Sequence, residues 1–402
     1  MKRVFAFLII ISLTFTMGCW DKKEITDLGI VVGLALDKGV KPDREVLATI
    51  QIANPKAFLP GGVSGNDEAF WTATGKGFTG RDAVDNMDYR IPKEVYFGQT
   101  RLLIIGKDAA QDGILPYLDR IWRSRQVRAN MYITIAEGTG KSILEVVMPT
   151  FRSSAIAMVN FFSMGNREAI LPMTLAEFTH DLSTSKGGAV APMVATVEQS
   201  SVTLEDKKKD GSAPQTILVE KLAVFNSDGK MVGVFNEEET KGLVWILDKI
   251  ESMLIKVPSP DNEVSEPVAL RCTKSKRKTV VKLDEDGLPH FEIQVQADTT
   301  VEEYFGEGGE LSKKWFLNSL EKRVNICIEQ EIMAAIQKGK VLNCDVFLFG
   351  EEVKRQHVRA WNSNLKDRWE EIFPLVPVEV KVNSRIFSQG LSGDSPGTIK
   401  EE

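Results

Sequence analysis

Apolar residues in the first half of the chain fall into short runs that alternate between strand-like and helix-like spacing. Residues 28–36 form a continuous apolar run that ends at Asp37-Lys38-Gly39, which is typical of a buried strand followed by a turn. A helix over 82–90, capped by Thr79, would turn Ala83 and Met87 inward. Strands are also predicted over 46–53, 101–105 and 131–136, and helices over 108–122 and from Ser142 onward. This succession predicts an α/β-like N-terminal domain with a mixed sheet.

The second half of the chain predicts hairpins and one long helix. Two strand pairs flank polar turns, 217–225 with 231–235 and 280–283 with 290–297. The helix is predicted over 312–338, and its inner stripe comprises Leu317, Leu320, Val324, Cys327 and Ile328. A strand over 342–349, a helix over 362–372 and a strand over 378–386 follow. The chain is therefore predicted to be a multidomain α+β protein whose C-terminal domain packs an antiparallel sheet on a long helix.

Polar segments indicate the domain boundaries. The predicted division is a signal peptide at 1–18, an N-terminal domain at 19–200, a polar linker or hairpin tip at 201–214, a C-terminal domain at 215–390 and a disordered tail at 391–402. A further division of the C-terminal domain near 258–266 stays open.

The N-terminus has the pattern of a lipoprotein signal. Lys2 and Arg3 precede the apolar run Val4–Phe15, and the sequence then reads Thr16-Met17-Gly18-Cys19. The run is shorter than the ~18–20 residues of a spanning helix. Gly before Cys resembles a bacterial lipobox, in which the Cys19 thiol is joined to diacylglycerol, although Thr16 stands where Leu is usual. A general signal peptide with an incidental cysteine is the alternative.

Charge limits the partners of this chain. The 402 residues contain 50 Lys and Arg against 56 Asp and Glu, which gives a net charge of -6 and leaves nucleic-acid binding without its main electrostatic term. Removing residues 1–18, whose only charged residues are Lys2 and Arg3, lowers the formal charge from -6 to -8. General attraction to anionic lipid is therefore weak, and two acyl chains, at ~0.8 kcal/mol per buried methylene, would have to hold the protein on a membrane.

No catalytic motif is complete. Gly140-Lys141-Ser142 follows a predicted strand and opens a helix, but Ile135 stands where a phosphate-binding loop needs glycine, which favours a plain turn. Gly62-Val63-Ser64-Gly65 resembles a nucleophile elbow, but Asn66 follows and no strand precedes it. A glycosidase carboxylate pair cannot be recognised without a structure. The three histidines are far apart: His180, His290 and His357. No cofactor, metal site or enzymatic activity is predicted.

Three further groups of residues have competing interpretations. Cys272, Cys327 and Cys344 read as free thiols of the core, although one disulfide remains open. The cluster Lys274, Lys276, Arg277 and Lys278 reads as a solvated strand end, with lipid headgroups or an anionic wall polymer as alternative partners. Trp361 and Trp369, two helical turns apart, read as core rather than interface.

Several blocks, in order along the chain, resemble one protein family. The first comprises Gly18-Cys19-Trp20-Asp21, Glu24 and Gly33-Leu34-Ala35-Leu36-Asp37. The second runs from Arg101 to Gly106, through Trp122-Arg123 and 131–136, to 138–144. The third comprises Asp345-Val346-Phe347-Leu348-Phe349-Gly350, Trp361, Trp369-Glu370, Phe373-Pro374 and 378–386, with Leu348 where the family has a smaller or more polar residue. Together they resemble the Ger(x)C lipoproteins, the C subunits of nutrient germinant receptors in endospore-forming bacteria.

The resemblance implies a non-enzymatic subunit needed for spore germination in response to small nutrients. Cys19 would anchor it on the spore inner membrane, with its folded part on the outer face, beside polytopic A and B receptor subunits. Trp20, Asp21 and Glu24 match the family so close to the anchor that they are expected to contact a partner or headgroups, unless they merely suit the signal peptidase. Whether this subunit binds the nutrient stays open. A solute-binding lipoprotein of a transport or sensing complex and a wall-modifying enzyme are the alternatives.

Overall fold

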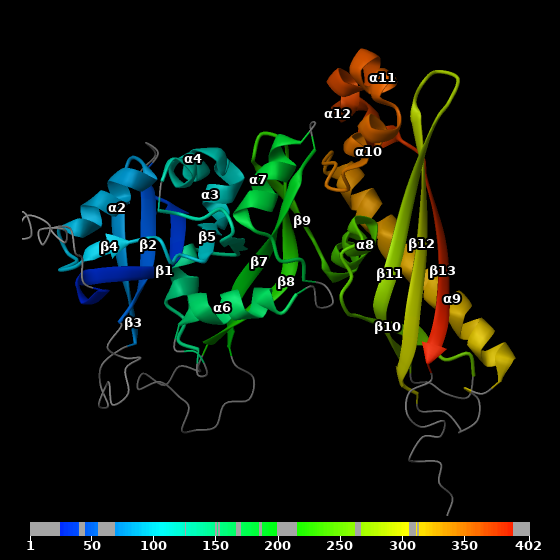
Figure 1. The fold of residues 1–402 in the computed structure, drawn as a ribbon, viewed down its shortest axis with the longest axis horizontal. Helices are drawn as coiled ribbons and strands as arrows, with labels where there is room; N and C mark the ends of the chain where they lie inside the picture. Colours follow the sequence, from blue (N-terminus) through cyan, green and yellow to red (C-terminus); the bar gives the residue numbers. More distant parts are fainter. Residues whose placement is uncertain are drawn as a thin grey trace, which may run out of the picture.

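The protein contains two β-sheets joined by a pair of packed helices (Figure 1). The computed structural model describes residues 25–39, 45–54, 69–124, 126–148, 151, 153–165, 170–184, 187–198, 215–261, 267–304, 311 and 313–388. The predicted signal peptide, the polar segment 201–214 and the tail 391–402 lie outside these residues. Within them the chain has the multidomain α+β architecture that its hydrophobic pattern predicts.

The first sheet has nine strands, ordered β3-β2-β1-β5-β6-β7-β8-β9, with β4 beside the start of β1. Its strands are β1 (Leu28–Lys38), β2 (Val46–Ala53), β3 (Phe70–Gly77), β4 (Glu94–Tyr96), β5 (Leu102–Gly106), β6 (Tyr132–Ala136), β7 (Ala189–Glu198), β8 (Gln215–Phe225) and β9 (Met231–Phe235). β1, β5, β6 and β7 run parallel, while β2, β3, β8 and β9 add antiparallel pairs at the two sides. The sheet is mixed, as predicted.

Residues 215–235 form the last two strands of this sheet, β8 and β9. Because the polar segment 201–214 precedes them, the sequence predicts that they belong to the C-terminal domain. Because β8 pairs antiparallel with β7, and β9 with β8, the first two strands of the predicted C-terminal domain complete the first sheet.

Helices cover both faces of the first sheet. They are α2 (Gly80–Asp88), α3 (Lys107–Asp112), α4 (Leu115–Arg123), α5 (Gly140–Leu144), α6 (Ser154–Ser163) and α7 (Leu175–Ser183). Residues of α5 and α6 pack with Ala35 and Ile104, whereas α2, α3, α4 and α7 pack on the opposite face with Leu34 and Ile105. Alternate residues of a strand point to opposite faces, so neighbouring apolar residues such as Ile104 and Ile105 fill different cores. This explains the continuous apolar runs of β1 and β5.

The helix predicted over 108–122 is two helices. Gly113 separates α3 from α4 with φ 122°, a conformation that L side chains rarely adopt. Thr79 caps α2 as predicted, because its hydroxyl accepts from the amide of Asp82 at 3.1 Å.

The second sheet has four strands, ordered β10-β11-β12-β13. They are β10 (Met253–Pro258), β11 (Pro267–Leu283), β12 (Pro289–Glu303) and β13 (Val378–Ser388). The long helix α9 (Lys314–Val341) lies along this sheet. Leu320, Val324 and Ile328 are buried as predicted, but the stripe starts at Phe316 rather than at half-buried Leu317.

Three details of the C-terminal domain differ from the prediction. β13 runs parallel to β12, so the sheet is mixed rather than wholly antiparallel. The strand predicted over 342–349 is absent from these described residues, which form turns before α10 (Phe349–Gln356). The helix predicted over 362–372 is a series of short segments: α11 (Val358–Ala360), a π-helical turn η6 (Trp361–Leu365), η7 (Lys366–Arg368), α12 (Trp369–Ile372) and η8 (Phe373–Leu375).

The helices α8 (Glu237–Leu247) and α9 connect the two sheets. Gly242 lies against the backbone of Glu331, where a Cβ atom would approach the carbonyl oxygen to 1.9 Å, so only glycine permits this approach. Three residues later, the indole N–H of buried Trp245 donates to the Glu331 carboxyl at 2.8 Å. Burial raises the pKa of Glu331 to about 7.

This raised pKa predicts a pH-dependent stability. The folded chain holds a proton on Glu331 between its ordinary pKa of 4.5 and about 7, so the free energy of unfolding should fall as the pH rises through this interval. The shift corresponds to about 3 kcal/mol at most. Glu331→Gln keeps an acceptor for Trp245 and cannot ionise. Urea unfolding between pH 5 and pH 8 should therefore show a smaller loss of stability in the variant, and equal losses in both proteins would contradict the assignment.

Candidate functional site

The predicted anchor and contact residues, Cys19, Trp20, Asp21 and Glu24, lie outside the residues that the structure describes. The described chain begins at Ile25, and β1 starts at Leu28, which pairs with Glu94 of β4. Any N-terminal anchor is therefore connected to the protein beside β4. None of the helices in the described ranges has the length and apolar character needed to cross a membrane.

The turn that resembles a phosphate-binding loop is occupied by a carboxylate of the protein itself. Asp37, at the end of β1, accepts hydrogen bonds from the backbone amides of Gly140 at 2.6 Å and Lys141 at 3.0 Å. Burial is the main reason that the pKa of Asp37 is raised, although both amides counteract the effect. A side chain on Gly106 would collide with this carboxylate. The motif is thus a structural turn, as the missing glycine predicts.

A second buried carboxylate organises the C-terminal block. Asp345 accepts from the backbone amides of Phe349 at 3.0 Å and Gly350 at 2.7 Å, and from the indole of Trp369 at 3.0 Å. Burial raises the pKa of Asp345, although the hydrogen bonds from these three donors counteract the effect. Trp361 and Trp369 are both buried, with ring centroids 5.3 Å apart in an edge-to-face arrangement. The prediction that these tryptophans belong to the core is confirmed.

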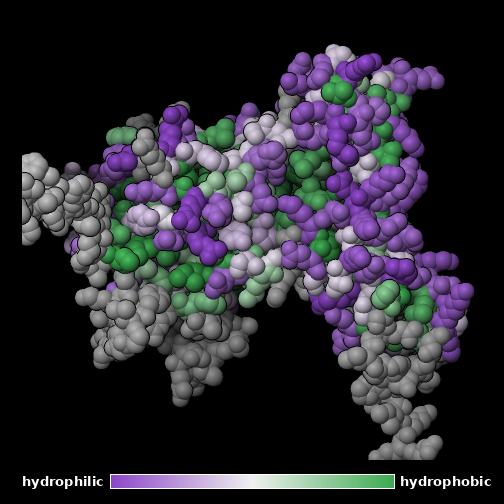
Figure 2. Space-filling view, in the orientation of Figure 1, coloured by the Kyte–Doolittle hydropathy of each residue, from purple (hydrophilic) through white to green (hydrophobic). Residues whose placement is uncertain are grey.

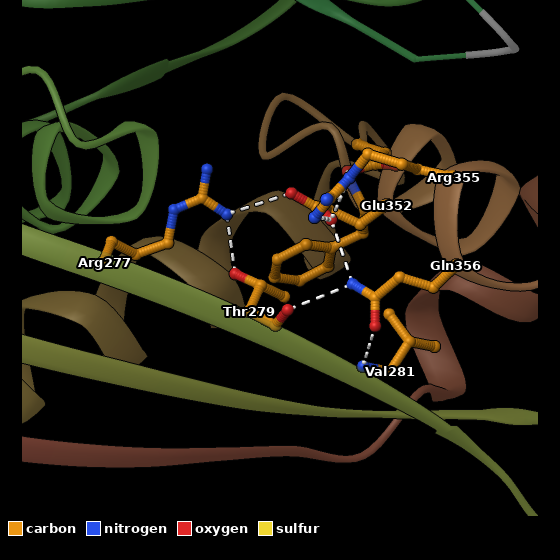
Figure 3. Close-up of polar contacts among 8 residues, drawn as sticks. Arg277, Thr279, Val281, Glu352, Arg355 and Gln356 are labelled. Carbon is orange, nitrogen blue, oxygen red and sulfur yellow. Dashed lines mark hydrogen bonds and ion pairs between the residues drawn. The ribbon is translucent and has the colours of Figure 1, made fainter.

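Side chains of α10 cover part of the exposed edge of β11 (Figure 3). β10 pairs with β11 only as far as Cys272. Further along, the Gln356 amide donates to the carbonyl of Thr279 at 3.0 Å and accepts from the amide of Val281 at 2.9 Å, as a neighbouring strand would. His357 contacts the Val281 carbonyl at 2.9 Å. These bonds satisfy backbone groups that would otherwise be available to another strand.

The basic cluster separates into two parts. Arg277 points toward α10 and contacts Glu352 at 3.3 Å and the Thr279 hydroxyl at 2.6 Å (Figure 3). Lys274, Lys276 and Lys278 are exposed, and none of the three forms an ion pair within the described ranges. Arg277 is therefore structural, and the three lysines are available to a partner.

A cleft of about 950 Å³ lies between α2, β4 and α4. Val84 and Phe97 form part of its apolar lining, and two ion pairs stand at its rim, Arg81 with Asp85 at 2.5 Å and Arg123 with Asp119 at 2.9 Å. No His or Cys is found among the described residues that line it. The polar side chains that line it are instead mostly charged, and four of them form the two rim ion pairs.

The three cysteine thiols in the described part of the chain are free. Cys272 and Cys344 are buried and Cys327 is half-buried. Burial raises the pKa of Cys272 and Cys327 to about 11 and that of Cys344 to about 12, which keeps them protonated and unreactive. Within the described ranges, His, Cys, Asp and Glu side chains form no group of three that could hold a metal ion.

The sequence does not indicate the contacts that Glu331, Gln356 and His357 form. Glu331 lies on the same face of the predicted helix as the buried residues Val324 and Ile328. A carboxylate on this apolar face is the sequence feature that could have indicated a buried polar contact. Gln356 and His357 bind residues of β11 that lie more than 70 positions earlier in the sequence, so no local pattern indicates these contacts.

Comparisons with known proteins agree with this fold. Residues 21–196 match the family described as "Spore germination protein N-terminal domain", and residues 220–390 match "Spore germination B3/ GerAC like, C-terminal". Spore germination protein KC of Bacillus subtilis is 25% identical over 97% of this chain and 96% of that protein. Spore germination protein B3 of Bacillus subtilis is 22% identical, and GerQC of Bacillus cereus is 21% identical, each over 98% of this chain and 100% of the relative.

A solved structure has the same fold. The crystal structure of the GerBC protein superposes with a TM-score of 0.55 at 19% identity, covering 90% of this chain and 100% of that one. Because the two family matches together span both sheets and the relatives are similar along their full length, the chain belongs to the Ger(x)C family of spore germination proteins.

Proposed function

We propose that this chain is the lipid-anchored C subunit of a nutrient germinant receptor, that it acts in spore germination beside polytopic A and B subunits, and that it performs no catalysis. The observation that carries the proposal is its full-length similarity to spore germination proteins KC and B3. The site geometry supports a non-catalytic role, because the buried carboxylates Asp37 and Asp345 bind backbone amides rather than an open cavity.

The alternative of a solute-binding lipoprotein has less support. Such proteins hold their ligand between two similar α/β lobes. Here the first sheet has nine mixed strands covered on both faces, and the second has four strands beside one long helix. The cleft between α2 and α4 lies within one lobe, and its rim arginines are already paired with Asp85 and Asp119.

Deletion of the gene tests the receptor role. Spores should lose germination through one nutrient receptor, because its C subunit is missing, and should keep germination by a non-nutrient trigger. Germination is measured as the fall in optical density of a spore suspension, with a complemented strain as control. Loss of both responses would contradict the proposal and indicate a general function in the wall or cortex.

The anchor belongs to the same proposal. Cys19, preceded by Gly18, would carry the diacylglyceryl group and hold the folded part on the outer face of the spore inner membrane. At most ~3.6 Å per residue, the eight residues Trp20–Asp27 span under ~30 Å, which keeps the start of β1 near the bilayer.

Cys19→Ala tests the anchor. The variant should lose labelling by a palmitate analogue and retain its signal peptide, because the thiol that accepts the diacylglyceryl group is gone. Cys272→Ala is the matched control, since its thiol is buried and should not affect labelling. Labelling that persists in Cys19→Ala would refute the assignment.

We further propose that Trp20, Asp21 and Glu24 contact the A or B subunit or lipid headgroups. Substituting Asp21 and Glu24 together with Ala should reduce co-purification with the membrane subunits while labelling at Cys19 continues, because the charges would be lost from a contact and not from the anchor. The exposed pair Asp286→Ala with Glu285→Ala on the distant β11–β12 turn provides the control. Normal complex yield from the first double variant would leave recognition by the signal peptidase as the explanation.

A further inference from the structure

The outer face of the second sheet carries a regular array of cations. On β11, Lys274, Lys276 and Lys278 alternate with inward-facing residues, so all three point away from α9. Their cross-strand neighbours on β12 and β13 form three rows: Lys274, Asp298 and Arg385; Lys276, Gln296 and Asn383; Lys278, Gln294 and Lys381. These nine positions contain five cations and a single anion.

Partners within the sheet neutralise only the β13 side of this array. Arg385 contacts Asp298 at 3.0 Å, and Lys381 contacts Glu292 at 3.2 Å and Glu379 at 3.1 Å. The three lysines of β11 remain without an ion pair among the described residues. The uncompensated charge is therefore concentrated along one strand of a chain whose net charge is -6.

The array is small and polar. Strands lie ~4.8 Å apart and same-face residues ~6.8 Å apart, so the nine positions cover about 10 by 14 Å. Gln296, Gln294 and Asn383 fill the remainder with hydrogen-bonding amides. Hydrophilic residues also dominate the visible surface over β11–β13 and the adjacent helices in Figure 2. A protein partner would be expected to meet an apolar centre, which these positions lack.

From this geometry we propose that the outer face of β11–β13, which we call the lysine face (Lys274, Lys276 and Lys278 with their row neighbours), binds the surface of an anionic phospholipid bilayer. A bilayer supplies a plane of phosphate charge and needs no apolar counterpart in the centre of the contact. Phe387, on the same face of β13, is 75% exposed and lies 5.6 Å from the Arg385 guanidinium. An aromatic ring beside basic side chains suits the headgroup region.

The test uses the mature polypeptide from residue 19 with Cys19→Ala, which retains every described residue and excludes the acyl chains. Its partition onto sucrose-loaded vesicles is measured by sedimentation, with phosphatidylcholine alone and with equimolar phosphatidylglycerol. Each lysine near an anionic surface contributes ~1 kcal/mol, about fivefold in affinity, so replacing Lys274, Lys276 and Lys278 with Gln should weaken binding to the anionic vesicles about 100-fold.

A matched variant controls for total charge. Lys76→Gln, Lys322→Gln and Lys366→Gln removes the same charge from exposed positions on β3, α9 and η7, and should bind as the parent does. Equal loss in both triple variants, or equal binding of the parent to both kinds of vesicle, would overturn the proposal. The proposal would also be overturned if the parent bound an acidic protein but did not bind the anionic vesicles.

Lysines on an edge strand also oppose self-association, so each variant is checked by size-exclusion chromatography. If the lysine-face variant self-associates, the salt dependence of binding by the parent protein provides a test that does not need the variant. Binding of the parent to anionic vesicles should fall steeply between low and high salt, because the contact depends on exposed charges. Binding that is indifferent to salt would refute the lysine face as a lipid contact.

Discussion

The close approach of α8 and α9 is the constraint on which the arrangement of the two sheets depends. The chain passes from β9 to β10 through α8, and Gly242 brings that helix against the backbone of α9 at Glu331. At this distance a larger residue would separate the helices, and the buried bond from Trp245 to Glu331 would lose its geometry. Phe235 of β9 also packs near Phe347, with ring centroids 6.4 Å apart, and the Gly188 amide donates to the Asp345 carbonyl at 3.3 Å, so these contacts support the helix pair in holding the second sheet against the first.

Buried carboxylates stabilise the N-termini of two helices, one beside each sheet. Asp37 binds the first amides of α5, and Asp345 binds those of α10 together with the indole of Trp369. A buried carboxylate is tolerable only when its oxygens are fully hydrogen-bonded, and amides at a helix N-terminus provide strong donors. The family blocks that contain these residues, 33–37 and 345–350, therefore have a structural explanation that does not invoke a ligand.

Local pattern predicted those elements whose burial follows a simple period. The apolar run 28–36 became β1, and Thr79 caps α2. The apolar residues of 342–349 did not form a strand because Asp345 caps the following helix and Leu348 adopts a left-handed conformation with φ 62°. A short apolar run cannot by itself distinguish a strand from a buried turn. β11 is longer than predicted. Its middle carries exposed lysines on one face and Ser275 and Arg277 on the other, so the hydrophobic pattern does not identify this part as a strand.

Of the candidate functional features, Cys19 could be proposed from the sequence because a pattern that resembles a lipobox is a local signal, whereas the lysine face required knowledge of the register. Lysines two residues apart define a surface only when the strand is known to extend through them and when β12 and β13 are placed beside it. The edges of this sheet are partly covered by side chains, since Gln356 and His357 bind β11 and the Asn325 side chain accepts from the Ser384 amide of β13 at 2.7 Å. A sheet covered by α9 on one face and protected at its edges presents its other face to the surroundings. That face is where a contact independent of the proposed N-terminal anchor can form.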